Sequence, residues 1–250
     1  SRGLGDVYKR QIMIRLDKYL ADMGIGTRSE VKNIIRKKQV SVNGMPISKP
    51  EAKVDITKDT VCYQGKTVAY EPYVYYMLNK PGGCVSAVKD NLYPTVLSFI
   101  ENPKGYNLFP VGRLDLDTEG LLLITNDGTL AHELLSPKKH VTKTYFAKVQ
   151  GRVTREDVQR FSLGLDIKEE KPTLPATLVI EKSDDISEIR VSITEGKYHQ
   201  VKRMFEAVGK QVLFLKRLSM GTLQLDESLT PGSYRALTTE ELSALKNRTI

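Results

Sequence analysis

The sequence predicts an α+β protein with two parts. One is a small N-terminal helix–helix–hairpin domain, and the other is a larger domain with a mixed, mainly antiparallel sheet flanked by helices. Residues 13–58 contain two helical patterns and then an alternating apolar run that closes on Asn-Gly. Beyond residue 73, strand-like and helix-like runs follow one another without a regular strand–helix repeat, which argues against a parallel α/β fold.

The N-terminal elements are predicted from short local signals. Apolar residues recur at i, i+4 and i+7 from Leu16, which is one face of a helix. Thr27 and Glu30 have the spacing of a capping box, which predicts that a second helix begins there. The run 40–44 alternates apolar and polar residues and ends in Asn-Gly, a pattern typical of a hairpin.

The remaining chain divides by composition. Residues 1–12 show no amphipathic period or cap and precede Met13, so we expect a leader that is not native. Residues 59–72 contain Gly, Pro and mixed charge and are expected to form a linker before the larger domain, 73–250. In that domain the pattern predicts strands at 74–78, 120–125, 143–150, 176–182, 188–194 and 211–218, and helices at 129–135, 198–208 and after Thr238.

Composition narrows the class of protein. No apolar run approaches the ~20 residues that span a bilayer, and no signal-peptide pattern is present. Cys62 and Cys84 form neither a disulfide framework nor a metal-ligand cluster, so we expect a cytoplasmic protein with reduced thiols. The net charge is +8, and residues 13–58 hold ten Lys or Arg against five Asp or Glu. A basic module of this kind indicates nucleic-acid binding, although a solvated basic surface gives the same count.

An acidic cluster stands directly before the most apolar strand. Asp115, Asp117 and Glu119 alternate, so in an extended segment they would share one face. The cluster fits a magnesium site, a carboxylate pair for glycosidic chemistry, a single nucleophilic aspartate, or a structural polar turn. Arg113 lies two residues before Asp115, where its charge favours an ionised carboxylate and weakens a metal site.

Two further segments carry candidate residues. The run 195–205 leads from a glycine turn into a helix whose first turns are basic, which suits phosphate, although an ordinary amphipathic helix has the same pattern. Tyr145 lies in the alternating strand 143–150, where its ring either stacks on a base or packs in the core.

Residues 13–58 resemble the small RNA-binding domain of ribosomal protein S-four. The similarity rests on three runs, 15–20, 27–30 and 40–44. The resemblance implies that a basic face binds structured RNA. At matching positions this face consists of Arg28, Lys32, Arg36, Lys37 and Lys38.

The whole of 13–246 resembles the pseudouridine synthases of the RsuA type, which modify ribosomal RNA. The matching runs are 78–81, 112–128, 143–145 and 195–205. The resemblance implies that Asp115 is the catalytic aspartate, Tyr145 the active-site tyrosine and Lys202 the cation beside the aspartate. Lys202 stands where relatives often have arginine, and lysine lacks arginine's bidentate fork.

The expected activity is the isomerisation of a specific uridine, in small-subunit (16S) rRNA. Asp115 is expected to attack the sugar or the base, Arg113 to hold the flipped nucleotide, and the basic run to contact RNA through Lys197, His199, Gln200 and Arg203. We expect no cofactor, metal or membrane, a monomer, and ribosomal RNA or a pre-ribosomal particle as partner. The alternatives are a 23S rRNA synthase of the same family, a non-catalytic ribosome-assembly factor, and a magnesium-dependent nuclease.

Overall fold

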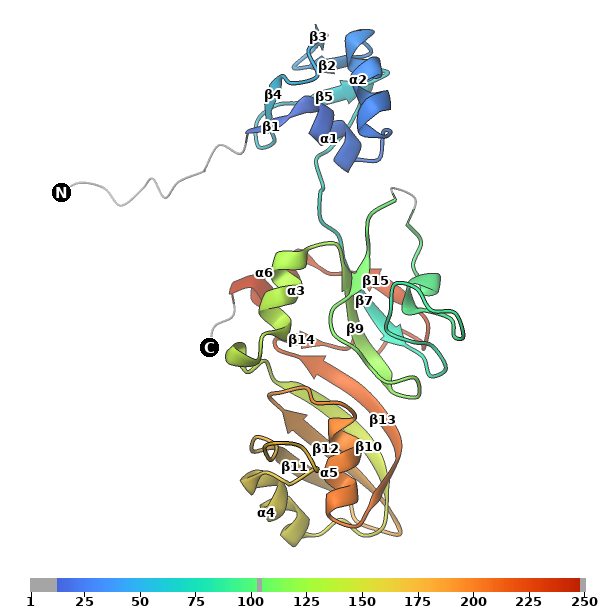
Figure 1. The fold of residues 1–250 in the computed structure, drawn as a ribbon, viewed down its shortest axis with the longest axis vertical. Helices are drawn as coiled ribbons and strands as arrows, with labels where there is room; N and C mark the ends of the chain where they lie inside the picture. The colour runs from blue at the N-terminus through green and yellow to red at the C-terminus, as the bar shows by residue number, and fades with distance from the viewer. Residues whose placement is uncertain (1–12, 103–104, 248–250) are drawn as a thin grey trace, which may run out of the picture. The chain divides into compact units, whose positions relative to one another are not determined.

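A computed structural model describes residues 13–102 and 105–247 (Figure 1). The expected leader, residues 1–12, lies outside this described part. The chain divides into two compact units. One unit comprises the described residues up to Tyr73 together with the segment Asn102–Tyr106, and the other comprises Val74–Glu101 and the chain from Asn107 onward.

The helices of the first unit follow the sequence prediction. α1 (Leu16–Asp22) and α2 (Arg28–Arg36) bury their apolar faces in one core. The predicted capping box is confirmed: Glu30 N–H donates to Thr27 Oγ1, and Thr27 N–H donates to Glu30 Oε2 at 2.7 Å. Because each side chain satisfies a free backbone donor of the other, the start of α2 is fixed locally.

The sheet of this unit extends beyond the predicted hairpin. Its strand order is β3-β2-β5-β6, and a separate pair joins β1 to β4. Residues 59–72, expected as a linker, instead contain β5 and β6, and β5 pairs with β2. These strands are too short to give a clear alternating pattern. The bounds are β1 (Met13–Arg15), β2 (Val40–Val42), β3 (Met45–Ile47), β4 (Lys53–Asp55), β5 (Val61–Tyr63) and β6 (Lys66–Thr67).

The second unit is built on one large sheet with the order β11-β12-β10-β13-β9-β7-β15, to which β14 and β8 add at β13 and β9. Among the described strands of this sheet, β13 and β9 form the parallel pair, and the other pairs are antiparallel. The predicted mixed, mainly antiparallel sheet is therefore confirmed. The bounds are β7 (Tyr75–Lys80), β8 (Phe109–Pro110), β9 (Glu119–Thr125), β10 (Lys143–Gln150), β11 (Thr177–Lys182), β12 (Ile186–Ile193), β13 (Gln211–Met220), β14 (Leu223–Gln224) and β15 (Tyr234–Ala236).

Helices cover this sheet in two groups (Figure 1). α3 (Gly128–Leu135) and α6 (Thr239–Asn247) share a core cluster with β9 and β7. α4 (Arg155–Leu163) and α5 (Gln200–Ala207) lie against the part formed by β10 to β13, and Phe161 of α4 meets Phe205 of α5 with ring centroids 4.9 Å apart. The sequence prediction omitted α4, which has few apolar residues. Two short 3-10 turns lie at Val96–Phe99 and Pro137–Lys139.

β9 is the rigid element that supports the acidic cluster. It lies between β13 and β7, and the side chains of residues 121–124 are fully buried. At Gly120 the backbones of β9 and β13 lie close together. The φ of Gly120 is +97°, and an added Cβ would lie 2.3 Å from the carbonyl oxygen of Arg217. A side chain is therefore excluded at this position. No helix in the described ranges is long and apolar enough to cross a bilayer.

Candidate active site

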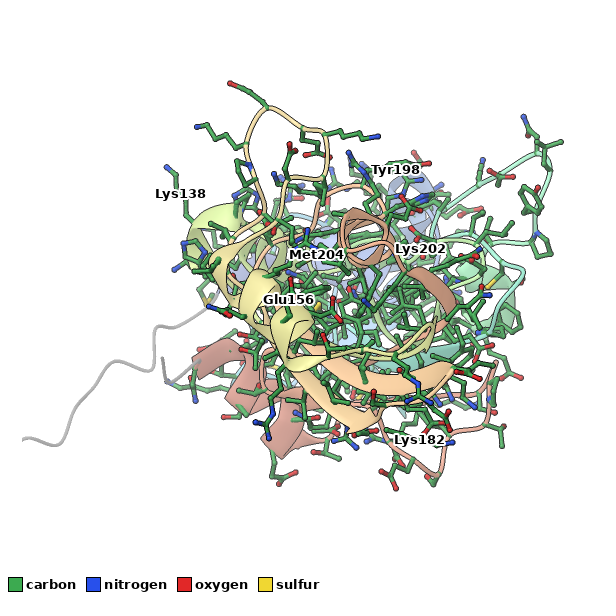
Figure 2. The ribbon with its side chains drawn as sticks, turned by 90° about the horizontal axis from the view of Figure 1, so that it is seen from below. Lys138, Glu156, Lys182, Tyr198, Lys202 and Met204 are labelled. Atoms are coloured by element: carbon green, nitrogen blue, oxygen red, sulfur yellow. The ribbon has the colours of Figure 1, made fainter. Side chains whose placement is uncertain are left out.

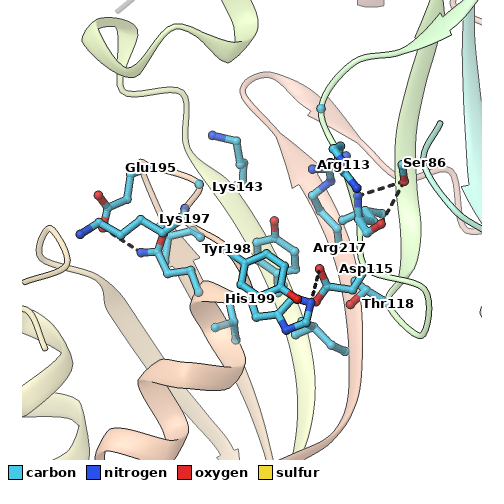
Figure 3. A pocket seen from close by; sticks show the side chains of 18 of the residues that line it. Ser86, Arg113, Asp115, Thr118, Lys143, Glu195, Lys197, Tyr198, His199 and Arg217 are labelled. Carbon is cyan, nitrogen blue, oxygen red and sulfur yellow. Dashed lines mark hydrogen bonds and ion pairs between the residues drawn. The ribbon is translucent and has the colours of Figure 1, made fainter. Parts of the chain in front are cut away.

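A cavity of about 650 Å³ opens in the second unit (Figure 3). It is bordered by the loop that precedes β9, by β10 and β13, and by the connection from β12 to α5. Six of the eight catalytic and RNA-binding residues predicted in this unit meet here. Those that line the cavity are Arg113, Asp115, Tyr145, Lys197, His199 and Gln200.

The loop that carries Asp115 is fastened by backbone contacts. Thr118 N–H donates to the carbonyl of Asp115 at 3.2 Å, which closes a turn. Ser86 Oγ accepts from Leu114 N–H at 3.0 Å and donates to its carbonyl at 3.1 Å. The backbone is thus held before Asp115 by Ser86 and at Asp115 itself by Thr118, which fixes the position of Asp115.

A buried lysine lies beneath the same loop. Lys80 is fully buried, and its ammonium donates to the carbonyls of Pro81, Leu116 and Thr118. The last of these bonds is 2.8 Å long. Burial lowers the pKa of Lys80, and the nearby Cys84 and the acidic cluster oppose that shift. Because a buried ammonium needs every donor satisfied, these carbonyls and Lys80 hold one another in place.

Lys202 of α5 bridges two members of the acidic cluster. Its Nζ lies 3.1 Å from Asp115 Oδ2 and 2.6 Å from Asp117 Oδ1. α5 presents Lys202 while burying Met204 (Figure 2). Burial lowers the pKa of Lys202, but hydrogen bonds to Asp117 and Asp115 outweigh it and raise the pKa above its ordinary value. Lys202 is therefore a fixed positive charge beside Asp115.

The magnesium alternative is not supported by the arrangement of the carboxylates. The ammonium of Lys202 stands between Asp115 and Asp117, where a bridging cation would bind. Glu119 begins β9 and, among the described residues, makes no hydrogen bond or ion pair with either aspartate. Within the described ranges, no three His, Cys, Asp or Glu side chains converge in a metal-binding group.

Arg113 differs from the sequence expectation. It is exposed at the cavity and, in the part of the chain that is described, makes no ion pair with Asp115. The expected pairing assumed that residues 113–115 run as an extended segment with both side chains on one face, but these residues belong to no strand and Arg113 is exposed. The cation beside Asp115 is Lys202 instead of Arg113.

His199 contacts Asp115, although the sequence placed it among the RNA-binding residues. Its Nε2 lies 3.5 Å from Asp115 Oδ1, because His199 adopts φ +48° immediately before α5. Tyr198 is 74% exposed and stacks on the imidazole, with ring centroids 3.8 Å apart. No local sequence signal gives the left-handed backbone that turns His199 toward Asp115.

The other basic-run residues make contacts within the protein. Lys197 donates to the carbonyl of Lys171 at 2.6 Å. Arg203 pairs with Glu169 at 2.5 Å and also donates to the carbonyl of Ile167. Gln200 is buried and donates to Glu195 at 2.8 Å. Gln200 and Arg203 hold the loop through these contacts, and their contact with RNA stays a prediction. Of the five basic residues of the first unit that the sequence assigns to RNA binding, Lys32 is half-buried, and Arg28, Arg36, Lys37 and Lys38 are exposed.

The cavity also contains residues that the sequence did not single out. These are two cations, Lys143 from β10 and Arg217 from β13. Two buried polar atoms in the cavity walls, Thr118 Oγ1 and Arg217 Nη2, have no hydrogen-bond partner among the described residues. An available signal was the charged pair Lys216-Arg217 within a mainly apolar strand.

Comparison with known proteins identifies the family. Residues 74–207 match the family model described as RNA pseudouridylate synthase, and residues 14–61 match the S4 domain. The chain belongs to the RNA pseudouridylate synthase family. It is therefore an RNA-modifying isomerase with an S4 domain, as the resemblance had implied.

Relatives match over nearly the full length. The RNA pseudouridine synthase YtzG of Bacillus subtilis, described as uncharacterized, is 46% identical over 93% of this chain and 98% of its own length. Ribosomal small subunit pseudouridine synthase A of Salmonella typhimurium is 40% identical over 93% of this chain and its entire length. A crystal structure of a pseudouridylate synthase is 39% identical, covers 93% of this chain and 99% of that chain, and has a TM-score of 0.65.

Proposed function

We propose that this pseudouridine synthase isomerises a uridine of small-subunit ribosomal RNA, with Asp115 as the nucleophile. The observation that carries the proposal is the position of Asp115. Its carboxylate lines the cavity, and the ammonium of Lys202 lies 3.1 Å away on the rigid helix α5. A nucleophilic carboxylate must be ionised, and an adjacent fixed cation favours that state.

The proposed reaction breaks the N1–C1′ bond of uridine and forms a C5–C1′ bond in its place, without a cofactor. A uridine flipped from its stack enters the cavity. Asp115 attacks either C1′ of the ribose or C6 of the base, the N1–C1′ bond breaks, and C5 of the rotated ring bonds to C1′. C5 then loses its proton and N1 gains one, so the product is an isomer of the substrate. Tyr145 stacks on the base, and Arg113 at the exposed side of the cavity holds the nucleotide.

Small-subunit RNA is proposed because relatives with that named activity match over 93% of this chain and their own entire length. The S4 domain adds phosphate affinity through its exposed basic residues, so binding should weaken as salt rises. The same proposal includes a cytoplasmic, monomeric enzyme that acts without a metal ion on ribosomal RNA or a pre-ribosomal particle.

The test uses purified enzyme with 16S and 23S transcripts, and with particles assembled from each. Wild type should form pseudouridine at one position of 16S rRNA, in EDTA as well as in magnesium. Asp115→Asn should abolish the product while RNA binding is kept. Asp117→Asn, the matched control, removes a carboxylate from the same lysine and should lose far less activity. Product confined to 23S rRNA would replace the substrate assignment, and no product on any RNA would refute the enzyme.

A further inference from the structure

Lys143 and Arg217 are two cations in the cavity without an acidic partner. In the described part of the chain neither makes an ion pair, and Lys143 Nζ donates to the carbonyl of Val141 at 3.0 Å. Arg217 is 2% exposed; its Nε donates to the carbonyl of Leu121 at 2.8 Å, and its Nη2 has no partner among those residues. A buried guanidinium with an unused donor is costly unless a ligand completes it.

The acids of the cavity are already engaged elsewhere. Asp115 faces Lys202, and Glu195 accepts hydrogen bonds from Gln200 Nε2 and from Leu174 N–H, each 2.8 Å long. Burial and then the charge of Arg217 lower the pKa of Lys143 to about 8, against a weaker opposing effect of Glu195. This corner of the cavity therefore has positive charge that the protein does not neutralise.

The sheet places both cations around Tyr145. Lys143 stands two residues before Tyr145 on β10, so both side chains lie on one face. Arg217 of β13 is the cross-strand partner of Tyr145, which puts it on the same face. All three line the cavity, and Figure 3 shows Lys143 and Arg217 among its walls. A base stacked on Tyr145 would have these cations near its edge.

We propose that Lys143 and Arg217 stabilise the negative charge that the uracil ring acquires during isomerisation, through its carbonyl oxygens. The inference rests on the proposed function and holds for either site of attack. When Asp115 attacks C1′, the N1–C1′ electron pair stays on uracil and spreads over N1, O2 and O4. When Asp115 attacks C6, the C5–C6 π pair moves through C4 to O4. In both cases a preorganised cation in a water-poor site lowers the barrier.

Lys143 is the residue to test, because its known contact is confined to its own chain segment whereas Arg217 also supports β9. Lys143→Met removes the ammonium and keeps an unbranched side chain one atom shorter, and Lys143→Arg keeps the charge. In single-turnover assays, Lys143→Met should lower the rate by about 10²-fold, the range for removing one such donor, while leaving RNA affinity unchanged. Lys143→Arg should recover a large part of that loss.

RNA with 5-fluorouridine at the target gives an independent readout, since fluorine stabilises a uracil anion by withdrawing electrons. Cleavage of the N1–C1′ bond in this RNA should suffer clearly less from Lys143→Met than cleavage in uridine RNA. An equal loss on both substrates would overturn the proposal. A loss of RNA affinity at an unchanged rate would mean that Lys143 and Arg217 bind a phosphate of the RNA, and it would likewise overturn the proposal.

The pH profile supplies a second readout. The wild-type kcat/KM should fall as pH rises through about 8, because Lys143 loses its proton there, and Lys143→Arg should remove this fall. The charged groups facing Lys143 are Arg217 of β13 and Glu195 after β12, and neither is changed by the substitution. If wild type makes no pseudouridine the proposed function fails, whereas an active wild type with an equally active Lys143→Met refutes this inference alone.

Discussion

Gly120→Ala should destabilise the catalytic unit and displace the loop before β9. The added Cβ would lie 2.3 Å from the carbonyl oxygen of Arg217 and 2.8 Å from its nitrogen, whereas ordinary contact begins at 3.4 Å. β9 and β13 must therefore separate by about 1 Å. The nearest atoms that the Cβ would meet belong to the backbone of Arg217, so no side chain can move aside to make room. Overpacking costs ~1–3 kcal/mol, and the left-handed φ of +97° adds ~1–2 kcal/mol.

The expected destabilisation is thus about 2–5 kcal/mol, or a fall in Tm of roughly 5–15 °C for a unit of this size. Thermal unfolding followed by circular dichroism measures it, and the single-turnover rate reports the displaced Asp115. Gly128→Ala is the matched control. It begins α3 with nothing within 4 Å of an added Cβ, so it should leave Tm unchanged or raise it. Equal Tm values for the two variants would refute the close-approach argument.

Two further predictions follow from charged groups. Lys202→Met should lower the single-turnover rate about 10²–10³-fold by removing the cation beside Asp115, and Lys202→Arg should restore part of it; a Met variant near wild type would contradict the site geometry. Hydrogen bonds from Ser228 and then Arg235 lower the pKa of Asp226 to about 2, so its stabilising contribution is present above pH ~4 and is lost as pH falls through about 2. Acid unfolding should therefore be less steep for Asp226→Asn in that window, and an unchanged slope would refute the assignment.

Features encoded by neighbouring residues could be predicted from the sequence. The capping box of Thr27 and Glu30 needs only residues three apart, and the structure contains it. The acidic cluster before an apolar strand indicated a loop held in a defined place, the family resemblance singled out Asp115 in it, and Asp115 lines the cavity.

Features that depend on distant pairing were missed. Arg217 lies opposite Tyr145 across two strands far apart in the chain, and the local pattern does not say which strands pair. The same limit applies to residues 61–67, whose strands are too short to show a period. The expected Arg113–Asp115 pairing is absent from the described contacts, because the alternation argument holds only in a strand and residues 113–115 form a loop.

The double contact of Lys202 has a consequence for the covalent intermediate of the proposed reaction. Once Asp115 is esterified it carries no charge, and a lone ammonium in this partly buried position would resist that step. Asp117, 2.6 Å from the same ammonium and 72% exposed at its side chain, stays ionised throughout. In the proposed reaction we expect Asp117 to remain a counter-ion to Lys202, so that the charge of Lys202 stays balanced while the ester forms and is released. Asp117 should thereby lower the energetic cost of neutralising Asp115 when the ester forms, although it never touches the reacting atoms.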